Sequence, residues 1–286
     1  MDNSMLENVL PTLSRIADAL DRLSPIEAPN ADLLAHDGYI WDARTKIFHA
    51  IDTIQRLPLD SLKGIDQQRE TLMANTRAFA EGRRANNALL WGARGTGKSS
   101  ILKAIHGTLM KEGYSLGLVE IQREDLADLP LLMSQLSSVD RPFIIFCDDL
   151  AFEKDDISYK SLKAVLEGGL SGRPRNLVFY ATSNRRHLMP RQMMENERSS
   201  AINPSETTEE KISLSDRFGL WIGFHSVDQD TYLEMVDWYI SHYNLPVEQD
   251  DAHRQALTWA VGRGNRSGRS AFQFILDLAL RNQIDI

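Results

Sequence analysis

The sequence has 286 residues, of which 42% are hydrophobic and 25% are charged, enough for a hydrophobic core and for one or two domains. Its formal net charge of −8 argues against broad, sequence-independent DNA binding as the main activity, although a local basic patch stays compatible with it. The single cysteine excludes an internal disulfide, and no apolar run reaches the roughly 20 residues that span a membrane, so we expect a cytoplasmic protein without a membrane partner.

Residues 1–60 are predicted to form an N-terminal helical segment. A second helix in it is expected over residues 39–55, after a proline-containing linker at residues 24–30. Both helices are expected to pack in a core, with a recognition surface as the alternative. The apolar positions at helical spacing are Leu6, Val9, Leu10, Leu13, Ile16, Leu20 and Leu23 in the first helix, and Ile40, Ile47, Phe48, Ile51 and Ile54 in the second.

Residues 61–227 are predicted to form one α/β domain. Strands that alternate with helices and are nearly continuous in apolar residues indicate a parallel sheet that is covered on both faces. A polar stretch at residues 189–213 is predicted to be a loop. Residues 228–286 have only helical patterns and are predicted to form a small separate lid. The five predicted strands lie at residues 88–91, 115–121, 143–147, 177–182 and 220–224.

The segment Gly92-x4-Gly97-Lys98-Ser99 joins the first predicted strand to a helix and has the pattern of a phosphate-binding (Walker A) loop. In such a loop, glycines let successive N–H groups face phosphates at the positive end of the helix. Lys98 would neutralise the phosphates, and the Ser99 hydroxyl can bind Mg²⁺. A glycine-rich turn without a ligand is the alternative. We predict a nucleoside triphosphate site with contacts from Gly92, Ala93, Arg94, Gly95, Thr96, Gly97, Lys98, Ser99 and Ser100.

Polar residues also follow other strands, and ligands gather at the carboxyl ends of parallel strands. Asp148 has the position of a Mg²⁺-associated carboxylate, and Asp149 could polarise the attacking water, with two helix caps as the alternative. Asn184 could position that water through its amide or simply form a turn. Arg217 precedes the fifth strand and could meet a phosphate in a neighbouring subunit or be a solvated charge. Cys147 is predicted to be a buried thiol rather than a nucleophile.

Five segments in a fixed order resemble an AAA+ ATPase, and more narrowly a bacterial family of AAA+ ATPases of unknown function. They are GARGTGKSS, FIIFCDDL, YATSNRRHL, LSDRFGLWIGF and GRGNRSGRSAFQF. The resemblance covers about residues 60–286. It implies a P-loop NTPase with a five-stranded parallel sheet of order 5-1-4-3-2, a C-terminal helical lid, and rings or arcs of subunits with ATP between them.

The same resemblance implies roles for individual residues. Asn184 matches the sensor-1 residue, and Arg217 resembles the arginine finger. Arg269 matches the sensor-2 arginine, with Arg266 as its rival. The segment that packs against adenine is matched by Leu62, Gly64 and Ile65.

Two departures from the AAA+ pattern shape the functional hypothesis. Asp149 stands where most AAA+ enzymes have Glu, so turnover is expected to be slow. Residues 122–130 lack the aromatic-apolar-glycine loop of protein-threading rings, which disfavours an unfoldase. The sequence therefore predicts a Mg²⁺-dependent ATPase that forms a homo-oligomer and remodels or switches a protein or nucleic-acid partner. An ATP-gated assembly or adaptor module with little turnover is the alternative, and a small-molecule kinase fits poorly.

Overall fold

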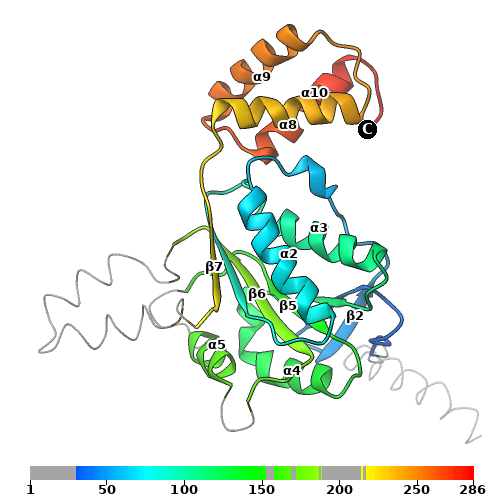
Figure 1. Ribbon diagram of the computed structural model, residues 1–286, viewed down its shortest axis with the longest axis vertical. Coiled ribbons are helices and arrows are strands. Elements are labelled where there is room, and N and C mark those ends of the chain that lie inside the picture. The colour runs from blue at the N-terminus through cyan, green and yellow to red at the C-terminus, as the bar shows by residue number, and fades with distance from the viewer. Residues whose placement is uncertain (1–29, 153–157, 169–171, 187, 189–213, 215–216) are drawn as a thin grey trace, which may run out of the picture.

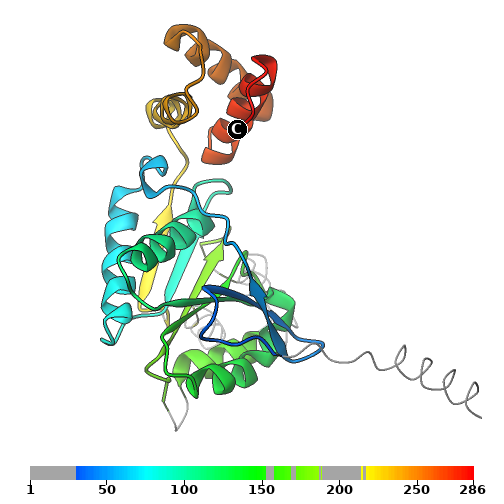
Figure 2. The same ribbon diagram turned by 90° about the vertical axis from the view of Figure 1, so that its right-hand side faces the viewer.

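The computed structural model describes residues 30–152, 158–168, 172–186, 188, 214 and 217–286 (Figure 1). The predicted N-terminal helix, most of the linker that follows it and the predicted loop at residues 189–213 lie outside the described residues. The described elements comprise a sheet with helices on both faces and a group of helices beyond one end of the sheet (Figures 1 and 2).

The described residues form a seven-stranded sheet of order β2-β1-β4-β5-β6-β3-β7. The five predicted strands occur in the predicted order, because β7, β3, β6, β5 and β4 correspond to 5-1-4-3-2, and they are all parallel. The predicted number of strands is wrong, since β1 and β2 extend the sheet beyond β4. The strands are β1 (Gly38–Asp42), β2 (Ile47–Ile51), β3 (Ala88–Gly92), β4 (Gly117–Glu120), β5 (Phe143–Cys147), β6 (Leu177–Ser183) and β7 (Leu220–Phe224).

The two additional strands replace the helix that was predicted over residues 39–55. Tyr39 and Trp41 are buried while Ile40 between them is 38% exposed, which is the two-residue period of a strand. Asp42 forms the turn, because its side chain accepts hydrogen bonds from the backbone N–H groups of Arg44 (2.8 Å) and Thr45 (3.3 Å). β1 pairs antiparallel with β2 and parallel with β4, so this hairpin belongs to the main sheet.

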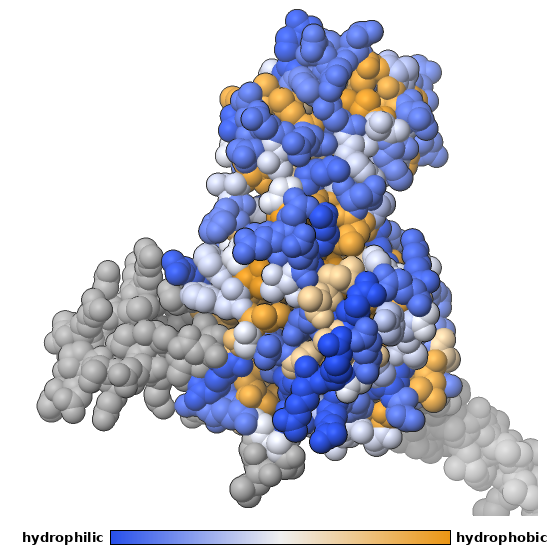
Figure 3. All heavy atoms as spheres, in the orientation of Figure 1, coloured by the Kyte–Doolittle hydropathy of each residue, from blue (hydrophilic) through white to orange (hydrophobic). Residues whose placement is uncertain are grey.

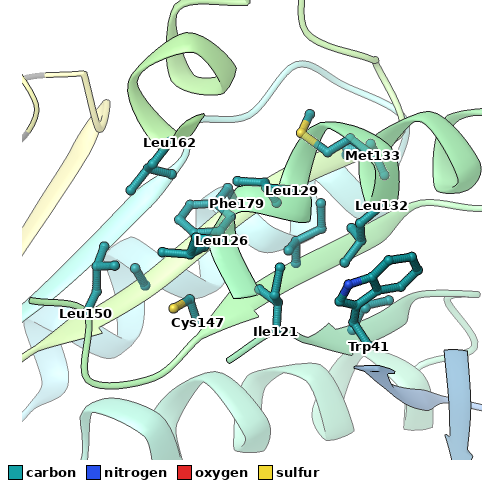
Figure 4. Close-up of a cluster of buried hydrophobic side chains, with 14 of the residues drawn as sticks. Trp41, Ile121, Leu126, Leu129, Leu132, Met133, Cys147, Leu150, Leu162 and Phe179 are labelled. Atoms are coloured by element: carbon teal, nitrogen blue, oxygen red, sulfur yellow. The ribbon is translucent and has the colours of Figure 1, made fainter. Parts of the chain in front are cut away.

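Each face of the sheet has its own hydrophobic core. Helices α2 (Asp66–Ala80) and α3 (Lys98–Lys111) cover one face, and α4 (Leu129–Ser137) and α5 (Ser158–Glu167) cover the other. Successive residues of β5 alternate between the two cores, so that Phe146 belongs to the core under α2 and α3. Cys147 belongs to the core under α4 and α5 (Figure 4). Cys147 is buried as predicted, and burial raises the pKa of its thiol.

Residues after β7 form helices α8 (Gln229–His242), α9 (Gln249–Arg263) and α10 (Gly268–Arg281), which pack around a third core. Asp228 caps α8 by accepting from the Thr231 N–H at 2.8 Å, and Ser267 caps α10. The backbone N–H of Gly268 donates to the carbonyl of Gly95 at 3.0 Å, which joins α10 directly to the phosphate-binding loop. Hydrophobic patches on the face in Figure 3 are small and separated. None of the described helices is long and apolar enough to cross a membrane.

Candidate nucleotide-binding site

A cavity of about 470 Å³ lies between the phosphate-binding loop, the carboxyl ends of β5 and β6, and helices α8 and α10. It brings together most of the residues that the sequence predicted. Gly64, Gly92, Ala93 and Arg217 were predicted but do not line it. The predicted residues that line it are Leu62, Ile65, Arg94, Gly95, Thr96, Gly97, Lys98, Ser99, Ser100, Asp148, Asp149, Asn184 and Arg269.

The phosphate-binding loop connects β3 to α3 through backbone conformations that require glycine. Gly92 has φ of +139°, and a Cβ atom there would lie 1.9 Å from the Phe224 carbonyl oxygen on the neighbouring strand. Gly97 has φ of +93° immediately before α3, which begins at Lys98. The loop therefore ends at the N-terminus of a long helix, where unpaired N–H groups and the helix dipole favour an anion.

Lys98 lines this cavity and is almost completely buried. It donates to the carbonyl oxygens of Gly92 (2.9 Å) and Ala93 (2.6 Å) and to the Asn184 side-chain oxygen (3.2 Å). These acceptors match the three protons of an ammonium group. Burial lowers the pKa of Lys98, and the nearby charges of Asp148 and Asp149 oppose that shift.

The two adjacent acids have different partners. Asp148 Oδ1 accepts hydrogen bonds from the Ser99 hydroxyl (2.6 Å) and from the Thr182 hydroxyl. Asp149 accepts from the Asn184 amide, and its Oδ2 lies 3.9 Å from an Arg94 guanidinium nitrogen. Asp149 also has φ of +52°, an uncommon conformation that Asp adopts more readily than most residues.

The donor set near Ser99 suits a hard cation. A hydroxyl and a carboxylate oxygen within hydrogen-bond distance of each other are typical Mg²⁺ ligands. The described residues contain no cluster of three or more His, Cys, Asp or Glu side chains that could hold a metal. Mg²⁺ usually keeps several waters and binds protein through one or two side chains plus substrate phosphates, which agrees with this small donor set.

Apolar side chains also line the cavity. Leu62 and Ile65, which the resemblance to AAA+ ATPases matches to the adenine segment, are both buried and line the cavity. Gly64 between them has φ of +70°, and a Cβ atom there would lie 2.5 Å from the Thr231 side chain, so it shapes this segment without lining the cavity. Further apolar lining comes from the segment before Leu62 and from the helices that follow β7: Leu57, Met235, Tyr239 and Phe272.

The two candidate sensor-2 arginines lie in different places. Arg269 belongs to the first turn of α10, lines the cavity and is close enough to Lys98 to affect its pKa. Arg266 does not line the cavity and instead helps to lower the pKa of Asp228, after the backbone N–H of Thr231 as the largest cause. The geometry therefore favours Arg269 over Arg266.

Arg217 lies away from the cavity of its own chain. In the register of β3 and β7, Gly92 pairs with Phe224, whereas Arg217 precedes the other end of β7. The length of β7, roughly 13 Å at about 3.3 Å per residue, therefore separates Arg217 from the phosphate-binding loop. Its guanidinium lies 2.5 Å from a carboxylate oxygen of Glu167 at the end of α5. Asp216, the acid that precedes Arg217 in the sequence and could also pair with it, lies outside the described residues.

Comparison with known proteins agrees with this architecture. Residues 34–282 match the model of the family described as "Protein of unknown function (DUF815)". The chain belongs to this family. No curated protein matches the chain.

Solved structures show that this DUF815 chain has the AAA+ fold. RuvB of Thermotoga maritima, a Holliday junction branch migration motor, is 16% identical, with a TM-score of 0.51 over 80% of this chain and 67% of RuvB. Orc1 of Aeropyrum pernix, solved in complex with DNA, is 14% identical, with a TM-score of 0.55 over 77% of this chain. The match spans 61% of the Orc1 chain. At these identities the likeness concerns the fold alone.

Sequence reasoning missed several lining residues of this DUF815 site. Thr182 was assigned only to a strand, although its position two residues before Asn184 placed it at the same sheet edge. Met235 and Tyr239 have the spacing of one helical face, a pattern that equally predicts core packing. Which helical face meets the cavity depends on how α8 and α10 pack against the sheet, and local spacing carries no such information.

Proposed function

We propose that this protein is a Mg²⁺-dependent ATPase that hydrolyses ATP between two copies of the chain and thereby remodels or switches a macromolecular partner in the cytoplasm. The observation that carries the proposal is the joining of Lys98, Asp148, Asp149, Asn184 and Arg269 around one cavity. These side chains include the positive charges, the metal-binding carboxylate, the base and the amide that phosphoryl transfer uses, which supports the proposal.

The proposed reaction uses each of these groups for one task. Lys98 and the N–H groups of the loop hold the phosphates, and Ser99 and Asp148 would hold Mg²⁺, which neutralises phosphate charge when bound. Asp149 accepts a proton from the water that attacks the terminal phosphorus, and Asn184 orients that water without competing for its proton. As the water oxygen bonds to the terminal phosphorus, the bond from this phosphorus to the bridging oxygen breaks, so that ADP leaves and inorganic phosphate is formed.

The apolar part of the cavity lining supports adenosine triphosphate as the substrate. Leu62, Ile65, Met235, Tyr239 and Phe272 enclose a space that suits a flat heterocycle. We place the nucleotide-binding domain at residues 61–227 together with the hairpin of β1 and β2, and the lid at residues 228–286. In this assignment, Arg269 reports nucleotide occupancy to the lid.

A subunit interface would complete the site. Arg217 lies at the far end of β7 and cannot reach the phosphates bound by its own chain. In the proposed assembly, the Arg217 of one copy contacts the terminal phosphate that a neighbouring copy binds. A guanidinium supplied in this way raises the hydrolysis rate by roughly 10³–10⁵-fold. The proposed partner on which turnover acts is a protein or a nucleic acid, and the DNA bound by Orc1 makes DNA one ligand to test.

One observation favours a second candidate function, an ATP-gated assembly or adaptor module with little turnover. The Asp149 side chain is one methylene shorter than Glu, and it is held by Asn184 and by a left-handed backbone conformation. A base held back from the phosphates would slow hydrolysis while leaving nucleotide binding intact.

Turnover measured against protein concentration separates the two functions. For the ATPase, we expect ATP binding by calorimetry and a rate per subunit that rises with concentration toward about 1 s⁻¹. Lys98→Ala should abolish measurable ATP binding with an unchanged circular dichroism spectrum, whereas the control Lys103→Ala on the same helix should bind normally. Equal ATP affinity of Lys98→Ala and the parent protein would refute the proposed site. Tight binding without turnover at any concentration would favour the adaptor.

A further inference from the structure

Thr182 connects the end of β6 to the two acids that follow β5. Its side chain is 2% exposed, and its hydroxyl contacts both acids. The hydroxyl donates to Asp148 Oδ1 and accepts from the backbone N–H of Asp149 at 2.9 Å. The carbonyl of Thr182 accepts from the Leu150 N–H at 2.7 Å. One residue therefore binds three consecutive residues of the neighbouring segment.

These bonds begin where pairing of the two strands ends. The last register pair of β5 and β6 joins Cys147 to Ala181, so Asp148 and Asp149 lie beyond the ladder. Asp149 has φ of +52°, a left-handed backbone conformation that is strained for a residue with a Cβ atom. The bond from its N–H to the Thr182 hydroxyl stabilises this conformation, and the bond from the same hydroxyl to Oδ1 holds the Asp148 carboxylate.

The direction of the hydroxyl proton follows from the partners. The Asp149 N–H can only donate, so the Thr182 oxygen accepts there and must direct its own proton to Asp148. Ser99 donates to the same Oδ1 atom at 2.6 Å. Among the described residues, Asp148 Oδ2 has no hydrogen-bond partner. Two donors thus hold one oxygen of the carboxylate, and the other is open to a cation.

We infer that Thr182 is a positioning residue for the metal-binding carboxylate. It fixes Asp148 so that Oδ2 is presented to Mg²⁺ and, through the backbone of Asp149, sets the place of the proposed base. The inference rests on the proposed function, in which Asp148 binds the cation of Mg·ATP. Outer groups that orient metal ligands typically account for about 10–100-fold in metal affinity.

The test measures how far Mg²⁺ strengthens ATP binding, which needs no turnover. The full-length chain is titrated with ATP by calorimetry in EDTA and in Mg²⁺, and the ratio of the two Kd values is the readout. Thr182→Val removes the hydroxyl at nearly constant volume and should lower this ratio about tenfold or more. Its Kd in EDTA should stay close to that of the parent, because Thr182 supplies no charge to the phosphates. Thr182→Ser, which restores a hydroxyl, should recover most of the ratio.

Thr76→Val is the matched control. Thr76 is also fully buried, and its hydroxyl donates to the Leu72 carbonyl on α2, but it does not line the cavity. The inference is overturned if Thr182→Val keeps the parental ratio, or if Thr76→Val lowers it equally. Should the Val variant not fold, Thr182→Ala gives the same test. A parent chain that binds no ATP in either buffer would refute the proposed function itself, a result distinct from an intact ratio in Thr182→Val.

Discussion

The amide of Asn184 orients two charged groups at once. Its oxygen accepts from the Lys98 ammonium at 3.2 Å, and its nitrogen donates to Asp149. An amide that bridges a cation and an anion has a fixed orientation, because each end matches only one partner. The sequence predicted all three residues from their places after strands or in the loop. It could not predict that they form one hydrogen-bonded chain, since that depends on side-chain rotamers at the sheet edge.

Asp149→Asn should bind ATP as the parent does but hydrolyse it about 10²–10⁴-fold more slowly, because a neutral amide cannot take the proton of water. Turnover and calorimetry on the same preparation check this. Asp149→Glu should be no faster than the parent protein, since φ of +52° disfavours Glu relative to Asp. Unchanged turnover in Asp149→Asn would assign the base elsewhere, with Glu153, which lies outside the described residues, as the next acid to test.

At the scale of elements, the strands that were predicted correctly are apolar runs that end in polar residues, as β5 does at Asp148. The hairpin of β1 and β2 was missed because Ile47, Ile51 and Ile54 also fit a helical face. Short apolar runs do not distinguish a strand from a helix, and here the open edge of β4 decides the outcome. Pairing with a neighbouring strand depends on the tertiary structure, so the spacing of apolar residues in one segment cannot predict it.

The hairpin predicts different outcomes for two truncations. Deleting residues 1–29 should leave ATP affinity and the melting temperature close to those of the full chain. Deleting residues 1–56 should cause aggregation or a large loss of stability, because it removes the buried Tyr39, Trp41 and Phe48 and exposes the edge of β4. Thermal melts and light scattering measure both variants. A stable, monodisperse 57–286 fragment would contradict the assignment of the hairpin to the core.

His106 on α3 contacts Arg56, which follows the hairpin of β1 and β2, and makes the stability of the protein depend on pH. Its ring accepts from Arg56 at 3.1 Å and donates to the Leu116 carbonyl at 2.9 Å, so the partners fix the neutral form. Burial lowers its pKa from 6.5 to about 4. Below pH 6.5 the unfolded chain takes up a proton that the folded chain does not, so stability falls as the pH decreases toward 4.

The expected loss from His106 between pH 7.5 and 4.5 is about 2 kcal/mol of unfolding free energy. Urea denaturation at both pH values measures it. His106→Gln is the control, because an amide offers a donor and an acceptor in similar places but does not titrate. The parent should lose about 2 kcal/mol more than the variant over this range. Equal losses in the two proteins would show that His106 does not titrate on unfolding.

At the scale of the whole molecule, the candidate nucleotide-binding site is formed by the sheet with its loops and by the helices after β7. Gly268 donates to the Gly95 carbonyl, and the Trp238 indole N–H donates to Asp60 at 3.2 Å, so the helices after β7 contact both the loop and the segment before α2. The sequence predicted helices here, as a lid, but not which of their faces line the cavity. The proposed site also includes a second chain, since the phosphate that Arg217 would contact is bound by another copy.

Arg217 therefore offers a prediction that only an assembly can fulfil. Arg217→Ala should bind ATP normally and lose about 10³-fold or more in hydrolysis rate, because no guanidinium then stabilises the negative charge of the transition state. Glu167→Gln is the matched control, since both substitutions break the same ion pair. An ion pair this exposed contributes about 0–1 kcal/mol, so Glu167→Gln should stay active. If the two variants lose activity equally, Arg217 acts through the ion pair and has no role at a neighbouring site.

Mixing distinguishes a finger from a residue that supports its own subunit. Arg217→Ala keeps an intact phosphate-binding loop, and Lys98→Ala keeps an intact Arg217, so a mixed interface can join one working half of each. Equimolar mixing of the two inactive variants should restore part of the parental ATPase rate, and dilution should abolish the gain because the interface dissociates. A mixture that stays inactive at every concentration, beside a parent whose rate per subunit is independent of concentration, would place the complete catalytic site within one chain.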